Sequence, residues 1–307
     1  MNAELRGIIS IPVTPFDSTG ALDERSLREE VAFALACGSH GLLVPVNASE
    51  WYTLSDDERK RITQITLAEA REAVPVVVGV TAQSANLSIE LARHAQDLGA
   101  FAVNAMPPHV LQLDARGCFQ FYRELSSSVD IPVIVQNYYP PIGTPMSTEL
   151  LARLVRELDN VYYVKEETPP EPNNISRLLQ ELAGDKKLRG VFGGQGGLYL
   201  IDELTRGVSG NMPATHAADA LVQVWELWEK GAADAAREVQ SRLLPLMVFE
   251  RCYGGSAVYK EVLYRRGVIS TTMTRSMNSG LDSVAKTLLT RILDDIEDLF
   301  RVAPPSA

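Results

Sequence analysis

The chain has 307 residues, of which 46% are hydrophobic and 22% are charged, and its formal net charge is −10 at pH 7. This composition is typical of a globular protein with a sizeable apolar core. The acidic excess argues against a nucleic-acid partner, because a protein that binds phosphates needs a basic face.

Targeting and covalent features of the sequence are sparse. No segment approaches the roughly 20 continuous apolar residues of a membrane helix, and MNAELRGIIS has no apolar run of signal-peptide length. Three widely spaced cysteines, Cys37, Cys118 and Cys252, match neither a disulfide framework nor a zinc spacing. We therefore expect a cytoplasmic protein with reduced cysteines, no membrane partner and no metal.

Short apolar runs rich in β-branched residues alternate along the chain with longer amphipathic stretches. The runs predict strands at residues 7–13, 41–46, 76–80, 100–105, 132–136, 161–165, 190–192 and 208–210. The stretches between them predict helices at 24–36, 56–73, 86–98, 117–127, 148–158, 175–183 and 198–206. Continuous apolar strands that alternate with helices indicate a parallel sheet covered by helices.

Eight such units favour a closed (β/α)₈ barrel, a TIM barrel, over an open doubly wound sheet. The first predicted strand is not followed by G-x-G-x-x-G, which weakens the dinucleotide-binding form of the open alternative. After residue 215 the pattern is purely helical, at 217–230, 232–250, 256–266 and 281–301. We predict an α/β barrel that carries the active site over residues 1–215. A C-terminal helical extension over 216–307 is expected to pack on it as one structural unit.

Lys165 ends the sixth predicted strand, Val161-Tyr162-Tyr163-Val164-Lys165. Catalytic residues of such barrels lie at the carboxyl ends of the strands. Desolvation there would lower the pKa of the amine and make it a nucleophile toward a carbonyl. The alternative is a lysine that reaches solvent or pairs with Glu166 or Glu167.

Three other strand ends carry polar residues. Val46-Asn47-Ala48-Ser49-Glu50 offers backbone N–H groups and a hydroxyl to an anion, or it is a turn with an N-cap. Gln136-Asn137-Tyr138-Tyr139-Pro140 brings amides and phenols to the rim, where the tyrosines could also simply pack. His109 follows the fourth strand, and a lone histidine there is more often structural than catalytic.

The segment Gly193-Gly194-Gln195-Gly196-Gly197 follows the seventh predicted strand. A phosphate site there would suit a barrel enzyme of unrelated chemistry, such as a phosphate-sugar isomerase. The segment has no basic residue and lacks the Lys-Ser/Thr ending of a P-loop, which disfavours that reading.

Over essentially its full length the chain resembles the dihydrodipicolinate synthase / N-acetylneuraminate lyase family. The resemblance rests on Ile11-Pro12-Val13-Thr14-Pro15-Phe16, on Leu54-Ser55-Asp56-Asp57-Glu58-Arg59 and on Val164-Lys165-Glu166, which falls where the family keeps its Schiff-base lysine. It implies a lyase that binds a small 2-oxo acid on Lys165, needs no cofactor and forms a homotetramer or homodimer.

The chain departs from the family at two loops. The usual Gly-Thr-Thr-Gly-Glu after the second strand is replaced by the Val46–Glu50 run, and Gln136 replaces the tyrosine of Tyr-Asn-x-Pro. Dihydrodipicolinate synthases also place an arginine just after that proline, whereas this chain has Pro141, Ile142 and Gly143. The departures disfavour the biosynthetic reaction, because an aspartate-semialdehyde carboxylate would lack its bidentate partner.

The departures resemble the L-2-keto-3-deoxyarabonate dehydratase branch of the family more closely. The matching segments are residues 47–50, 106–109, 135–137, 163–169 and 210–212, although His109 stands where that branch has tyrosine. The resemblance implies that a substrate contacts Asn47, Ala48, Ser49, Glu50, His109, Gly193 and Met212. Its carboxylate would bind Ser49 and the N–H groups of Ala48 and Ser49. Tyr138 or Tyr139 would supply the proton-relay phenol that Gln136 cannot, and the choice between them stays open.

The resemblance thus implies a lyase that dehydrates a 2-keto-3-deoxy sugar acid. A pyruvate-dependent aldolase or a dihydrodipicolinate synthase-type condensing enzyme would use the same imine. A non-catalytic 2-oxo acid sensor on the same barrel is the alternative of another class. The uncharged rim loop Met106-Pro107-Pro108-His109-Val110-Leu111 predicts a contact with a second copy. His109 is then expected near the partner's pocket.

Overall fold

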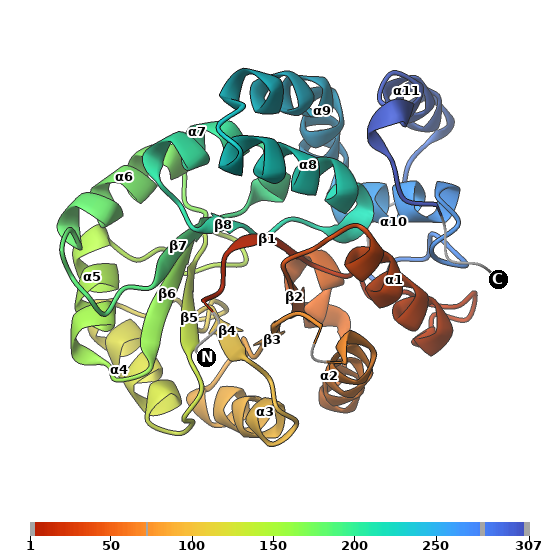
Figure 1. Ribbon diagram of the computed structural model, residues 1–307. Coiled ribbons are helices and arrows are strands. Elements are labelled where there is room, and N and C mark those ends of the chain that lie inside the picture. Colours follow the sequence, from red (N-terminus) through yellow and green to blue (C-terminus); the bar gives the residue numbers. More distant parts are fainter. Residues whose placement is uncertain (1–3, 72, 277–279, 304–307) are drawn as a thin grey trace.

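The computed structural model describes residues 4–71, 73–276 and 280–303. Within this part, eight parallel strands close into a barrel, in which β8 pairs with β1 (Figure 1). The strands are β1 (Gly7–Ser10), β2 (Gly41–Val44), β3 (Val76–Gly79), β4 (Ala102–Ala105), β5 (Val133–Asn137), β6 (Val161–Glu166), β7 (Gly190–Gly193) and β8 (Gly210–Asn211). The predicted (β/α)₈ barrel is confirmed.

Helices surround the barrel in chain order (Figure 1). They are α1 (Glu24–Ala36), α2 (Asp56–Ala70), α3 (Ala85–Asp97), α4 (Ala115–Ser126), α5 (Thr148–Glu157), α6 (Glu171–Glu181), α7 (Leu200–Arg206) and α8 (Ala218–Glu229). Because α8 buries Leu221 and Val224 in the same core as Ile8 of β1, it is the eighth helix of the ring. The barrel therefore extends past residue 215, where the sequence placed its end.

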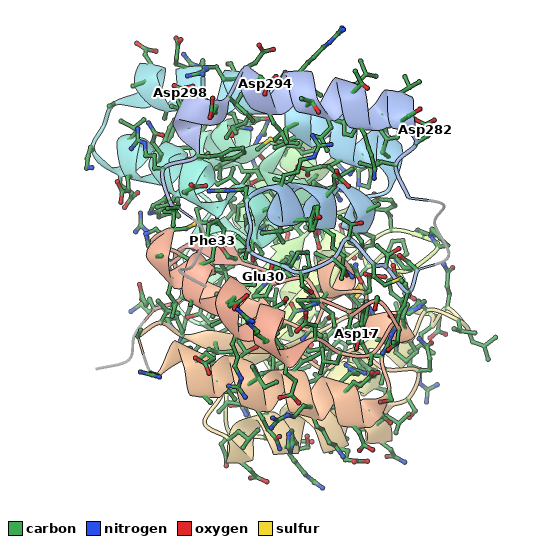
Figure 2. All side chains as sticks on the ribbon, turned by 90° about the vertical axis from the view of Figure 1, so that its right-hand side faces the viewer. Asp17, Glu30, Phe33, Asp282, Asp294 and Asp298 are labelled. Carbon is green, nitrogen blue, oxygen red and sulfur yellow. The ribbon has the colours of Figure 1, made fainter. Side chains whose placement is uncertain are left out.

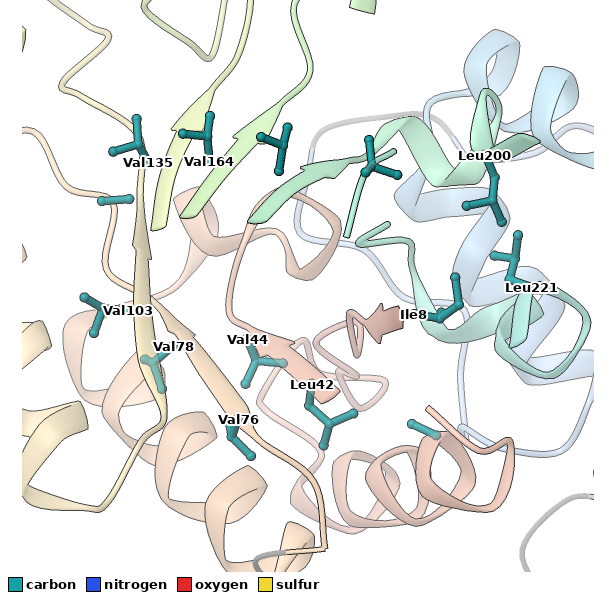
Figure 3. Close-up of a cluster of buried hydrophobic side chains, with 14 of the residues drawn as sticks. Ile8, Leu42, Val44, Val76, Val78, Val103, Val135, Val164, Leu200 and Leu221 are labelled. Atoms are coloured by element: carbon teal, nitrogen blue, oxygen red, sulfur yellow. The ribbon is translucent and has the colours of Figure 1, made fainter. Parts of the chain in front are cut away.

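The strand side chains alternate between two apolar layers. Leu42, Val44 and Val164 point outward into the core beneath the helices (Figure 3). Leu43 and Tyr163 point inward into a second core that fills the barrel. This two-residue period follows from the pleat of a strand. Both faces are buried, so most strand residues are apolar, and each buried Val, Leu or Ile contributes roughly 1.5–3 kcal/mol to stability.

Three further helices follow the ring: α9 (Ala233–Tyr253), α10 (Ser256–Arg265) and α11 (Ser283–Asp294). They gather on the side of the barrel where α8 and α1 lie (Figure 1). Figure 2 looks onto this side, with α11 between Asp282 and Asp294 above α1, which carries Glu30 and Phe33. The helix expected over 281–301 is shorter and is followed by a 3₁₀ turn, Glu297–Leu299.

Polar side chains cap the N-termini of several helices. Ser55 accepts a hydrogen bond from the Glu58 backbone while the Glu58 side chain bonds back to Ser55, a capping box that starts α2. Asp23, Ser84 and Asp114 cap α1, α3 and α4 in the same way, each with its side-chain oxygen. Among the described residues, no helix combines the length and the apolar character that crossing a membrane requires.

Candidate active site

A cavity of about 310 Å³ opens at the carboxyl ends of the strands. Its walls come from the ends of β1, β2, β5, β6 and β8, from the glycine-rich segment after β7, and from α9 and α10. The lining residues are Ile11, Val46, Asn47, Ala48, Gln136, Tyr138, Tyr139, Ile142, Lys165, Glu167, Gln195, Gly196, Met212, Ala214, Glu250, Arg251, Gly254, Gly255, Ser256 and Tyr259. This is the end of a barrel where enzymes place their chemistry.

Lys165 reaches the cavity from inside the barrel. Tyr163 belongs to the inner core, so the two-residue period of β6 directs Lys165 inward as well. The side chain is only 3% exposed, and its Nζ lies 3.3 Å from Glu167 Oε2. Lys165 thus lies in the cavity, as expected of a nucleophile, and also pairs with Glu167, as the alternative interpretation of the sequence proposed.

Gln136 sits directly beside Lys165, because the two are register partners on β5 and β6. Its Nε2 donates to Glu167 Oε2 at 2.6 Å, and its Oε1 accepts from Asn104 Nδ2 at 2.7 Å. An amide therefore lies beside the lysine, and both its nitrogen and its oxygen are hydrogen-bonded. Gln136 orients the Glu167 carboxylate but has no acidic proton to relay.

The loop after β2 divides into two parts. Asn47 and Ala48 line the cavity. Ser49 and Glu50 are fully buried and are not among the lining residues. The Ser49 hydroxyl donates to the Pro12 carbonyl at 2.6 Å, and Glu50 pairs with Lys260 of α10 at 2.5 Å. In this structure both side chains tie the loop to its surroundings.

Tyr138 and Tyr139 stack at the mouth of the cavity, with their ring centroids 4.5 Å apart. Burial and the neighbouring Glu167 carboxylate raise the pKa of Tyr138 well above its usual value, so this phenol stays protonated at neutral pH. The Tyr139 hydroxyl accepts a hydrogen bond from Arg251 Nη2 at 3.3 Å. Both phenols line the cavity, and the Tyr139 hydroxyl is the one that binds Arg251.

The remaining predicted substrate contacts are spread out. Met212 lines the cavity. Gly193 lies on β7, where an added Cβ would come within 2.2 Å of the Glu203 carboxylate of α7. His109 lies on the rim loop, bonded to Gln83 and edge-on to the Trp51 ring. Neither Gly193 nor His109 is among the lining residues.

A pair of buried carboxyl groups supports the glycine-rich segment from behind. Glu171 Oε1 accepts from the Gly194 N–H at 3.0 Å, and Glu203 Oε2 accepts from Asn211 Nδ2 at 2.7 Å. Burial, together with the facing Glu203, raises the pKa of Glu171 well above its ordinary value. Burial likewise raises the pKa of Glu203 to about 7. Burial and the neighbouring negative charge thus both favour the protonated, neutral form of Glu171.

Strand-end reasoning missed the wall that the C-terminal helices provide. Glu250 and Arg251 lie on the last turn of α9, and Tyr259 lies on α10. Glu250 Oε1 is 2.5 Å from His216 Nε2, and the His216 ring stacks on Tyr259. These residues could not be found from the sequence, because nothing local marks which turn of a long helix faces the barrel. Among the described residues, no group of three or more His, Cys, Asp or Glu is placed to hold a metal ion.

Comparison with known proteins agrees with this architecture. The profile of the Dihydrodipicolinate synthetase family matches residues 4–296. The chain is 33% identical to the L-2-keto-3-deoxyarabonate dehydratase of Azospirillum brasilense over 88% of its own length and 87% of the relative's. It is 30% identical to the 4-hydroxy-tetrahydrodipicolinate synthase of Methanopyrus kandleri, over 80% and 81% of the two chains.

The fold has close counterparts among solved structures. Dihydrodipicolinate synthase from Thermotoga maritima superposes with a TM-score of 0.90 at 26% identity, covering 97% of this chain and all of that one. The family profile and the full-length relatives confirm the resemblance that the sequence motifs indicated. The chain therefore belongs to the dihydrodipicolinate synthetase family, and it is an enzyme of the lyase class.

Proposed function

We propose that Lys165 forms a Schiff base with a 2-oxo acid and that the enzyme dehydrates a 2-keto-3-deoxy sugar acid. The observation that carries this proposal is the buried Lys165 amine, held in the cavity 3.3 Å from the Glu167 carboxylate. The buried amine can act as a nucleophile, and the carboxylate beside it can act as a general base. Both groups can therefore reach the same substrate.

The reaction can be written with these groups. The Lys165 amine attacks C2 of the substrate, and the carbonyl oxygen leaves as water, which gives a protonated imine. Glu167 takes a proton from C3, the electron pair of that C–H bond forms a C2–C3 double bond, and the π electrons of the imine move to nitrogen, which gives an enamine. The C4 hydroxyl then accepts a proton and leaves as water, while the nitrogen lone pair re-forms the imine and the C2–C3 double-bond electrons form a C3–C4 double bond. Hydrolysis of the imine releases the product and restores the amine.

Other cavity residues fit supporting roles. Asn47 and Ala48 line the cavity, and in this proposal the Ala48 backbone N–H and the Asn47 amide bind the C1 carboxylate. A phenol of the Tyr138–Tyr139 stack would protonate the departing hydroxyl. Gln136 replaces the tyrosine that the family usually has and holds Glu167 instead, which favours a carboxylate base over a phenol at C3.

The choice of dehydration over condensation rests on two observations. The relative from Azospirillum brasilense is named for the dehydration of L-2-keto-3-deoxyarabonate. Pro141, Ile142 and Gly143 supply no guanidinium after β5, where the resemblance would place the partner of an aspartate-semialdehyde carboxylate. A pyruvate-dependent aldolase would share the imine and differ only in which bond at C3 breaks.

Borohydride trapping tests the proposal. Incubation with pyruvate and borohydride should add one reduced pyruvyl group to the protein, and peptide mapping should locate it on Lys165. Lys165→Ala should abolish the adduct, and an adduct that persists in this variant would refute the Schiff-base assignment. Arg237→Met, a change at an exposed position near the start of α9, is the control.

Turnover assays then separate the reactions. We expect dehydration of 2-keto-3-deoxy sugar acids and poor conversion of aspartate semialdehyde with pyruvate. Efficient dihydrodipicolinate formation would contradict the proposed substrate class. Pyruvate release from the sugar acid, followed with lactate dehydrogenase, would instead identify an aldolase.

A further inference from the structure

Arg251 extends from the last turn of α9 to the mouth of the cavity. One arm of its guanidinium donates to Gln195 Oε1, and the other donates to the Tyr139 hydroxyl at 3.3 Å. Both acceptors are neutral and both line the cavity. In the part of the chain that the structure describes, no carboxylate oxygen lies within 4.0 Å of its nitrogens.

The other charged groups of the cavity have charged or ionisable partners. Lys165 pairs with Glu167, and Glu250 lies 2.5 Å from His216. Arg251 thus differs from them, because its positive charge faces the cavity without a carboxylate to balance it. A guanidinium with two oriented arms is well suited to bind a carboxylate through paired, charge-assisted hydrogen bonds.

Gln195 connects Arg251 to the proposed reaction centre. Its backbone N–H donates to Glu167 Oε1 at 3.3 Å, and its Nε2 donates to the Glu167 carbonyl at 3.1 Å. Glu167 in turn contacts Lys165. Lys165, Gln195 and Arg251 line the same cavity, so a ligand joined to Lys165 can extend along Gln195 toward Arg251.

We propose that Arg251 binds a terminal carboxylate at the end of the substrate opposite its 2-oxo group. The preferred substrates are then dicarboxylic 2-keto-3-deoxy sugar acids, in which both ends of the carbon chain are acidic. The bound carboxylate takes the place of Gln195 and Tyr139 as the acceptor of the guanidinium arms. This inference rests on the proposed Schiff base at Lys165, which fixes the other end of the substrate.

Paired probes that differ only in the terminal group test the inference. Imine formation is measured by borohydride trapping at increasing concentrations of 2-oxoglutarate against 2-oxopentanoate, and of 2-oxoadipate against 2-oxohexanoate. Within each pair the carbon number is equal, so the terminal carboxylate is the only variable. The wild-type enzyme should half-saturate with the better diacid at a concentration at least about tenfold below that of its monoacid partner.

Variants assign the preference to Arg251. In Arg251→Met the ratio of half-saturating concentrations should fall to near one, and Arg251→Lys should retain part of it. Arg237 lies on the same helix but pairs with Asp234 outside the cavity. The variant Arg237→Met should therefore keep the wild-type ratio of half-saturating concentrations. Because each ratio is taken within one protein, partial loss of folded enzyme does not affect it.

The outcomes separate the two proposals. If the wild-type enzyme traps pyruvate but binds both members of each pair equally, the Arg251 inference is wrong and the Schiff base stands. A preference for diacids that survives in Arg251→Met would also overturn it. Failure to trap pyruvate in the wild-type enzyme would instead overturn the proposed function itself.

Discussion

Glu167 Oε2 lies 3.3 Å from Lys165 Nζ, and the same oxygen accepts a 2.6 Å hydrogen bond from Gln136. The carboxylate is therefore held beside the amine by a neighbour that cannot titrate. Glu166, one residue earlier, faces the opposite side of β6, where Asn137 and Thr168 bind it. The two adjacent glutamates consequently have different surroundings. Substituting each in turn tests whether Glu167 acts as the base and Glu166 as a structural carboxyl.

Glu167→Gln should separate imine formation from the later proton transfer. The variant keeps Lys165, so pyruvate should still be trapped by borohydride. Dehydration should slow by roughly 10²–10⁴-fold, as expected when a general base is removed. Single-turnover kinetics measure both steps. Glu166→Gln is the control, and equal loss of dehydration in both variants would contradict the role given to Glu167.

The two stacked tyrosines should contribute unequally. Tyr138 and Glu167 line the same cavity, and burial together with this carboxylate raises the pKa of the Tyr138 phenol, whereas the Tyr139 hydroxyl is bound to Arg251 at the mouth. We expect Tyr138→Phe to lower kcat by at least about 100-fold and Tyr139→Phe by less than about tenfold. Steady-state kinetics of the two variants check this order, and a larger kcat loss in Tyr139→Phe would reverse the assignment.

Glu30 should make stability depend on pH. It is fully buried on α1, accepts a hydrogen bond from the Val13 N–H at 2.9 Å, and burial raises its pKa from 4.5 to about 8. The folded state therefore keeps this proton where the unfolded state releases it. The free energy of unfolding should fall as the pH rises from about 4.5 to about 8.

Chemical denaturation at several pH values measures this effect. Glu30→Gln removes the titratable group. Between pH 4.5 and about 8 the free energy of unfolding of this variant should fall less than that of the wild-type protein, with a difference on the order of 3 kcal/mol. Glu29→Gln, a partly exposed neighbour on the same helix, should keep the wild-type slope. Parallel pH profiles for Glu30→Gln and the wild-type protein would show that Glu30 does not hold its proton.

The rim loop should be covered by a second copy of the chain. Val110 and Leu111 are 73% and 81% exposed, next to His109. Apolar side chains this exposed on one uncharged loop favour self-association. Light scattering at micromolar concentration should give a dimer or tetramer, and Leu111→Asp should shift it toward monomer. A wild-type mass near 34 kDa would contradict the prediction, and a fully active monomer would exclude any role for His109 across subunits.

Local sequence determined the barrel and the place of its lysine. A strand alternates its side chains with a period of two, and the β-branched runs mark where each strand lies. On β6, Lys165 lies two residues after Tyr163 and therefore points to the same inner face. On β5, Gln136 lies two residues after Ile134 and also points inward. These positions depend on neighbours a few residues away, so the sequence alone was enough to predict them.

Tertiary structure decided the rest of the site. Glu50 pairs with Lys260, 210 residues later, and Arg251 reaches Tyr139 across 112 residues. Such contacts depend on how α9 and α10 pack over the barrel mouth. Helical periodicity predicts that a helix has a buried face, but not which loop that face covers. The sequence therefore predicted that all polar groups of the loop after β2 bind substrate. In the structure, packing directs Ser49 and Glu50 away from the cavity, and Arg251 of α9 lines it instead.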